Sequence, residues 1–136
     1  NYLKYLVLDG NGDILLLFIE KLKYTLIAVT DEVYIANFTI DESTFCKLIE
    51  ACFGVKRLVM VDCKFFMHDL LEIDDRLEYK IQEIDLYGSC GKNDQTYRNL
   101  AQSLSTTKIT ESLKKVHVKE DDLPTAEVAG IFTSWG

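Results

Sequence analysis

An apolar pattern that recurs along the chain constrains its fold more than any other feature of the sequence. The pattern places apolar residues at its first, fourth and sixth positions, as in LKYLVL over residues 3–8. Five copies begin at Leu3, Thr30, Val55, Ile81 and Leu113, so successive copies lie 27, 25, 26 and 32 residues apart. Only the copy at Thr30 has a polar first residue. One copy arises easily by chance, but five copies at nearly constant spacing indicate a structural repeat.

Each copy predicts a short strand, whose fourth and sixth residues face one side while the residues between them face the other. The strands are expected at 3–8, 30–35, 55–60, 81–86 and 113–118. Helical spacing of apolar residues predicts helices at 14–26, 42–53, 67–77 and 94–104, and a last helix from Pro124 to Thr133. We expect Asp41 or Ser43 to cap the helix at 42–53, and Gly54 to end it.

These units resemble leucine-rich repeats, whose consensus is LxxLxLxxN/CxL. The resemblance covers essentially the whole chain in five units. The third unit fits best, with Val55, Leu58, Met60, Cys63 and Phe65 at consensus places. The other units depart from the consensus after the strand, at Asp13, Phe38, Ser89, Gly91 and Asp121. The resemblance implies a single α/β solenoid over residues 1–136, a horseshoe with short parallel strands on its concave face and helices on its convex face.

Parallel strands in register place equivalent residues side by side, about 4.8 Å apart. One row on the face away from the helices is expected to hold Tyr5, Glu32, Arg57, Glu83 and Lys115. The next row is Val7, Tyr34, Val59, Asp85 and His117, and a third is Asp9, Ala36, Val61, Tyr87 and Lys119. The first row alternates in charge from its second member onward. Opposite charges on adjacent strands stabilise pairing, which supports this register.

The resemblance implies binding of another protein on the concave face, and it supplies no catalytic residues. The middle of this face is predicted to be apolar and aromatic, and such exposed patches often mark partner sites. The residues expected to contact a partner are Tyr34, Arg57, Val59, Val61, Glu83, Asp85, Tyr87 and His117. The alternative is that another segment of a longer protein covers this face.

Two other functions stay open. The chain is alternatively the repeat region of a larger enzyme, ligase adaptor or complex subunit whose chemistry lies elsewhere. A third alternative is a small flavodoxin-like α/β enzyme, which would need longer apolar strands and a ligand loop after the first strand.

Motifs for chemistry are incomplete in this sequence. Residues 88–92 lack the GxxxxGK[ST] spacing of a phosphate loop, and residues 9–13 match only part of a calcium loop. Cys63 is expected in a turn and His68 at the start of the following helix, where packing and capping explain them better than catalysis does. We therefore expect no catalytic residue, cofactor, metal ion or small-molecule substrate.

Charge, apolar runs and cysteine usage narrow the classes of partner and the cellular compartment. Fifteen basic and twenty-two acidic residues give a net charge of -7, which argues against a nucleic-acid-binding surface. The longest apolar run, at residues 14–19, is too short to span a membrane, and no secretory signal is visible. The four cysteines contain no CxxC pair and are expected to be reduced, which indicates an intracellular protein.

The N-terminal end of the pattern lacks a cap. The chain has no initiator Met, and the apolar residues of the first unit begin at Leu3. A solenoid needs polar surfaces on its terminal units. We therefore expect flanking repeats or a partner at this end.

Overall fold

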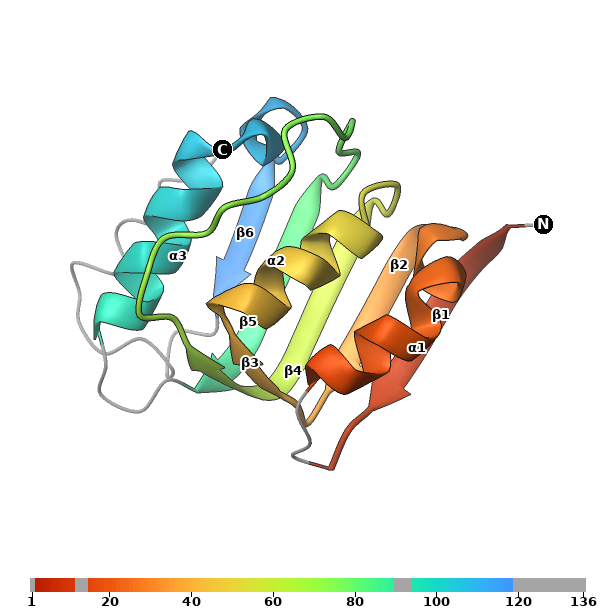
Figure 1. Cartoon of the computed structure of the whole chain (residues 1–136), viewed down its shortest axis with the longest axis horizontal. Coiled ribbons are helices and arrows are strands. Elements are labelled where there is room, and N and C mark those ends of the chain that lie inside the picture. Colours follow the sequence, from red (N-terminus) through yellow and green to blue (C-terminus); the bar gives the residue numbers. More distant parts are fainter. Residues whose placement is uncertain (1, 12–14, 90–93, 119–136) are drawn as a thin grey trace.

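A parallel β-sheet whose strands follow one another in chain order organises the protein (Figure 1). The computed structural model describes residues 2–11, 15–89 and 94–118, and within them the sheet has six strands. The sheet order is β1-β2-β4-β5-β6, and the short β3 pairs with the far part of β4. The strands are β1 (Leu3–Asp9), β2 (Val29–Ala36), β3 (Thr39–Asp41), β4 (Arg57–Phe66), β5 (Glu83–Ser89) and β6 (Lys115–Val118).

The observed register is the one predicted from the apolar spacing. Tyr5 pairs with Glu32, Glu32 with Arg57, Arg57 with Glu83, and Glu83 with Lys115. All five repeat strands are present, although the last three begin two residues later than expected and β4 continues to Phe66. The prediction of an α/β fold with a parallel sheet is therefore confirmed.

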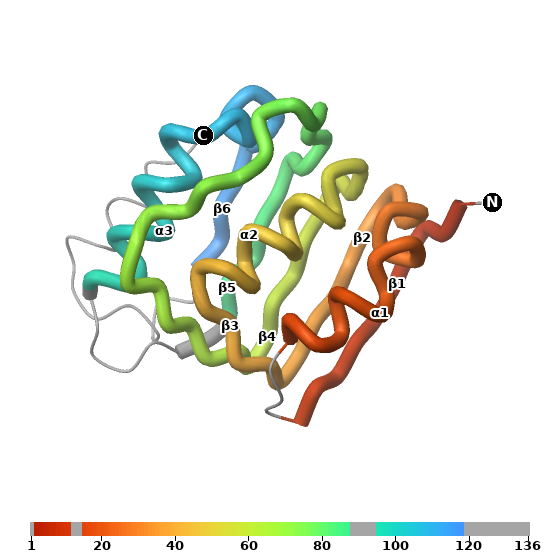
Figure 2. Tube along the Cα trace, viewed as in Figure 1, coloured from red at the N-terminus to blue at the C-terminus, as the bar shows by residue number. Residues whose placement is uncertain are grey.

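The helices lie on one face of the sheet, as Figures 1 and 2 show. Core-facing strand residues such as Val33, Leu58 and Ile84 are fully buried, and they form one hydrophobic cluster with apolar residues of all three α-helices. The helices are α1 (Leu15–Ile27), α2 (Glu42–Ala51) and α3 (Asp94–Thr106), and a 3-10 helix, η1 (Lys108–Glu111), follows α3. Three of the expected helices are therefore confirmed.

The start of α2 is capped as the sequence predicts, but its end is not. The Asp41 carboxylate accepts a hydrogen bond from the backbone N–H of Thr44 at 2.8 Å, which satisfies a donor of the first turn. The helix ends at Ala51, and Cys52 closes it by donating its N–H to the Leu48 carbonyl at 2.9 Å. Gly54 follows in the next turn, so the prediction that Gly54 ends the helix is wrong.

The helix expected at 67–77 does not form. Residues 67–82, here called the 67–82 connection, run without helical structure between α2 and α3 (Figure 1). Leu71, Ile73, Tyr79 and Ile81 are buried while the residues between them are mostly exposed, which is the alternation of an extended chain. The segment thus contributes to the core without the helical periodicity that the sequence suggested.

Side chains from the two flanking helices explain why the 67–82 connection is stable without a helix. Their oxygen atoms accept hydrogen bonds from backbone N–H groups that a helix would otherwise pair internally. Glu42 and Glu50 of α2 accept from His68 and Asp74, at 3.0 and 2.9 Å. Thr96 and Ser103 of α3 accept from Met67 and Leu71, at 3.2 and 2.8 Å.

The turns after β1 and β2 pack closely together. Asn37, in the turn after β2, has a φ of 60°. Asp62, at the register shift within the neighbouring β4, has a φ of 52°. Asn and Asp adopt such positive φ values more readily than most residues. Phe38, at the Asn/Cys place of its unit, is buried, and a Cβ on Gly10 would lie 2.2 Å from its ring. This approach requires glycine at position 10.

Several predictions lie outside the described residues. These are the helix at Pro124–Thr133, the row position of Lys119, and the turn residues Asp13, Gly91 and Asp121. Among the helices that the structure does describe, none combines the length and the apolar character that crossing a membrane requires.

Candidate binding face

The residues predicted to contact a partner share the face of the sheet opposite the helices, here called the sheet face. Alternation along each strand directs them away from the core-facing rows. The described residues of the sheet face are Tyr5, Val7, Asp9, Glu32, Tyr34, Ala36, Arg57, Val59, Val61, Glu83, Asp85, Tyr87, Lys115 and His117. All eight predicted contact residues are therefore brought together on one surface.

Two of the eight residues are buried and so are not available to a partner, contrary to the expectation. Val59 is 4% exposed and Asp85 is 0% exposed, whereas Tyr34, Val61 and Tyr87 are half-buried. Val59 is a short side chain at the centre of its row, between Tyr34 and Asp85 in the sheet. Asp85 is engaged by the longer Arg57 side chain. Their burial corrects the expectation that both form part of the exposed contact surface.

Arg57 is the centre of a charged cluster at one end of the sheet face. Its Nε donates to Asp85 Oδ2 at 3.1 Å, and its Nη2 donates to the same oxygen. Its guanidinium also lies 3.7 Å from a carboxylate oxygen of Glu32 on β2 and 3.7 Å from one of Glu83 on β5. The hydrogen bond with Asp85 raises the pKa of Arg57 above its ordinary value, so this cation is permanent. The predicted alternation of charge is thus realised as ion pairs from Glu32 through Arg57 to Glu83.

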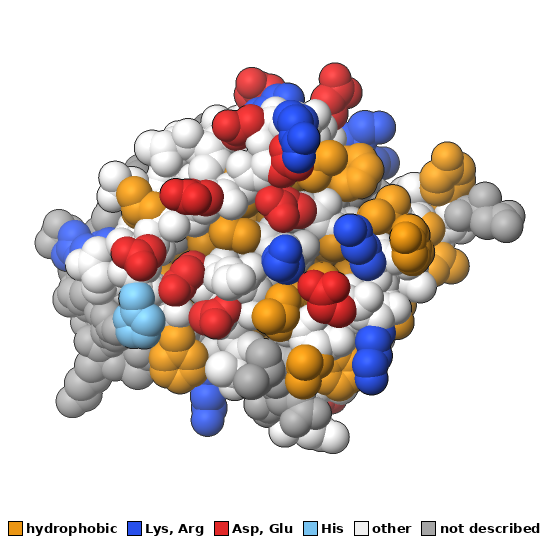
Figure 3. Space-filling model, in the orientation of Figure 1, with side chains coloured by type: hydrophobic (Ala, Val, Ile, Leu, Met, Phe, Trp, Pro, Cys, Tyr) orange, Lys and Arg blue, Asp and Glu red, His pale blue; other side chains and the backbone are white. Residues whose placement is uncertain are grey.

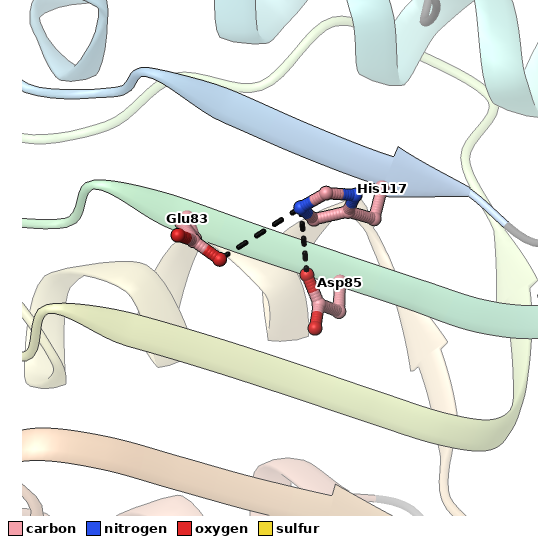
Figure 4. Close-up of side chains that lie close together, drawn as sticks. All are labelled: Glu83, Asp85 and His117. Carbon is pink, nitrogen blue, oxygen red and sulfur yellow. Dashed lines mark ion pairs between the residues drawn. The ribbon is translucent and has the colours of Figure 1, made fainter.

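A second group within the cluster joins β5 to β6 (Figure 4). His117 Nε2 lies 3.7 Å from Glu83 Oε2 and 3.9 Å from Asp85 Oδ1. Asp85 Oδ1 is buried and has no hydrogen-bond partner among the described residues. The sequence had placed the three residues in adjacent rows as partner contacts. Residues 83 and 85 are two positions apart on one strand and so face the same side, and residue 117 lies on the neighbouring strand. This spacing was the sequence signal for a shared site.

Apart from Asp9 and Lys115, the remainder of the sheet face is apolar or aromatic. Tyr5 and Val7 on β1 are 64% and 67% exposed. This apolar surface continues across the sheet with half-buried side chains, which are Tyr34 and Ala36 on β2, Val61 on β4 and Tyr87 on β5. The face therefore combines an aromatic, apolar area with a charged cluster beside it.

The helix-bearing side is a weaker candidate. Figure 3 shows acidic side chains gathered over its centre, and a hollow there lies between α2 and the 67–82 connection. Its acidic lining residues are Glu42, Glu50, Asp69 and Glu72. Glu42 and Glu50 already accept backbone hydrogen bonds from the connection, so they hold the fold together.

Cys63 and His68 do not form a catalytic pair. Cys63 is 1% exposed within β4, rather than in a turn as predicted, and its thiol donates to the Val61 carbonyl at 3.5 Å. Burial raises the pKa of this thiol, which disfavours the nucleophilic thiolate. His68 begins no helix, because the connection that follows is extended.

Comparison with known proteins found no matching family model, no matching curated protein and no matching solved structure. The function must therefore be inferred from the geometry of the sheet face.

Proposed function

We propose that the chain is part of a leucine-rich-repeat solenoid and that it binds another protein through the sheet face, without catalysing a reaction. The observation that carries this proposal is the sheet order, which follows the chain with every neighbouring pair parallel and with the described helices on one face. Stacking of successive strand–helix units produces this arrangement.

The same order argues against a flavodoxin-like enzyme. Doubly wound sheets reverse their strand order at one point and bind ligands in the crevice that the reversal creates. The described strands contain no such reversal.

The cysteines support a separate part of the proposal. Cys52 and Cys63 are buried thiols with raised pKa values, which favours a structural role for cysteine in a reducing compartment.

The composition of the sheet face supports a protein as the partner. Tyrosine and arginine are frequent anchors of protein interfaces, and Tyr34, Tyr87 and Arg57 are half-exposed on this face. The neighbouring charged cluster would set the orientation of a partner by charge complementarity.

Paired substitutions on opposite surfaces test this proposal. Chains carrying Tyr34→Ala and Tyr87→Ala together are compared with wild type, and with Tyr24→Ala as a control, by quantitative affinity capture from the native source. Tyr24 lies on α1 and is 86% exposed, so its loss leaves the sheet face intact. We expect a captured protein that is depleted at least about tenfold by the double variant and unchanged by the control, since anchors contribute roughly 2 kcal/mol or more.

Direct titration of that protein, once purified, completes the test. A partner that binds the double variant as tightly as wild type, or that is lost with Tyr24→Ala instead, would place the interface on the helix-bearing side. Either result contradicts binding through the sheet face.

A further inference from the structure

We propose that Glu83, Asp85 and His117 bind a divalent first-row transition-metal ion, for which Zn²⁺ is the appropriate probe. All three ligands come from this chain, so the site does not need the proposed protein partner to be complete (Figure 4). Imidazole with carboxylates is a donor set that such ions accept, with ligand distances of about 2.0–2.2 Å.

The separations of the donor atoms fit one ion. Tetrahedral ligands at these distances lie roughly 3.3–3.6 Å from one another. His117 Nε2 is 3.7 Å from Glu83 Oε2 and 3.9 Å from Asp85 Oδ1, and one atom from each of the three residues lies within 4.8 Å of the others. Small side-chain rotations of the half-exposed Glu83 and His117 would close these gaps.

The unpartnered oxygen of Asp85 points independently to a ligand. Asp85 is 0% exposed, and its Oδ1 accepts no hydrogen bond from the described residues while it lies toward His117. A buried carboxylate oxygen without a partner is costly, and native proteins rarely leave one unsatisfied. A cation between Asp85 and His117 would satisfy this oxygen.

The surroundings of the three residues suit a metal site. Arg57 holds Asp85 Oδ2 and so fixes the carboxylate with Oδ1 free, which is the role that outer hydrogen-bond partners play around metal ligands. The ligands stand on two adjacent, paired strands rather than on loops. The carboxylates of Glu32, Glu83 and Asp85 all lie against Arg57, so even with Lys115, the sheet neighbour of Glu83, counted as a second cation, one negative charge remains for the ion to neutralise.

Calorimetric titration of the whole chain with Zn²⁺ is the first test, and His117→Gln, Glu83→Gln and His68→Gln are the variants. His117 is 46% exposed and Glu83 36% exposed in their side chains, so both substitutions should preserve the fold, which circular dichroism would verify. His68→Gln is the matched control, because it removes the other histidine from an exposed position. We expect one equivalent to bind wild type and His68→Gln equally, and the other two variants to bind at least about tenfold more weakly.

Cobalt substitution separates this site from binding by cysteines. Co²⁺ on nitrogen and oxygen ligands gives only weak visible bands, whereas thiolate ligation adds strong near-ultraviolet absorption. Absence of stoichiometric binding to folded wild type, unchanged affinity in His117→Gln, or a thiolate band that disappears when the cysteines are alkylated would each overturn the proposal.

Discussion

Gly10 shows how a single residue is fixed by packing between neighbouring units. Because its Cβ would lie 2.2 Å from the Phe38 ring, Gly10→Ala must displace a buried aromatic side chain. We expect the free energy of unfolding to fall by about 1–3 kcal/mol. Urea denaturation measures this change. Gly54→Ala is the control, since a Cβ there meets nothing within 4 Å, and it should change stability by no more than about 0.5 kcal/mol. Equal effects of the two substitutions would disprove the packing explanation.

Arg57 is a second residue whose substitution should lower the free energy of unfolding. Arg57→Met leaves the buried Asp85 carboxylate without its hydrogen-bond donor. We expect a loss of about 1–2 kcal/mol in unfolding free energy, at the low end for a buried pair because Arg57 is 44% exposed and partly screened. Thermal and urea unfolding measure it. Arg76→Met is the matched control, because Arg76 pairs with Asp74 while 90% exposed, and it should have little effect. Comparable losses in both variants would refute a special role for Asp85.

The predicted contact residues illustrate what a sequence tells about a surface. The rows of the sheet face followed from apolar spacing alone, because parallel pairing in register leaves no freedom once the strands are aligned. The burial of Val59 and Asp85 did not follow, because exposure depends on how far neighbouring side chains reach, as Arg57 does to Asp85. The grouping of Asp85 with Glu83 and His117 also needed side-chain positions.

Among the elements, the strands were predictable and the 67–82 connection was not. The strands carry their own signal, since their core-facing residues recur at a fixed interval. The connection takes its hydrogen-bond partners from Glu42 and Glu50 before it and from Thr96 and Ser103 after it, and no local pattern reports such distant contacts. The three-residue strand β3 was missed for the same reason, since only its pairing with β4 defines it.

Ser103 tests whether α3 really holds the connection in place. Its Oγ accepts from the Leu71 N–H at 2.8 Å, so Ser103→Ala leaves a buried donor unpaired and should cost about 1–3 kcal/mol. Ser105→Ala is the control on the same helix, because among the described residues the Ser105 hydroxyl bonds only to the Ala101 carbonyl one turn earlier. Chemical denaturation measures both, and amide exchange at Leu71 should accelerate in Ser103→Ala alone. Unchanged exchange at Leu71 would mean that the connection is held by its apolar contacts.

At the scale of the whole molecule, the distribution of apolar residues separates the side that holds the core from the side proposed to bind a partner. Core residues of the strands and of all three α-helices form one cluster between the helices and the sheet. The sheet face lies outside this cluster, and its exposed Tyr5 and Val7 are not needed to complete it. Substitutions on the sheet face can therefore change binding while the core stays intact.

The buried thiol of Cys52 links the stability of the whole molecule to alkaline pH. Burial raises its pKa from an ordinary value of 9.0 to about 12. Between these values the unfolded chain releases the proton and the folded chain retains it, so the unfolded state binds fewer protons and the unfolding free energy falls as pH rises. The stabilisation that the protonated Cys52 thiol contributes is fully present below about pH 9. Above that pH, the slope of the unfolding free energy against pH approaches about 1.4 kcal/mol per pH unit. Burial also raises the pKa of Tyr79, which acts in the same direction at higher pH.

Urea denaturation at several pH values between about 8 and 11 measures this dependence. We expect the stability of wild type to decline above about pH 9, and Cys52→Ala to decline less steeply even though its loss of packing lowers stability at every pH. Cys46→Ala is the control, because Cys46 is only half-buried and its pKa, although also raised, has no comparably large shift. A Cys52→Ala curve parallel to that of wild type would show that the alkaline loss of stability has another origin.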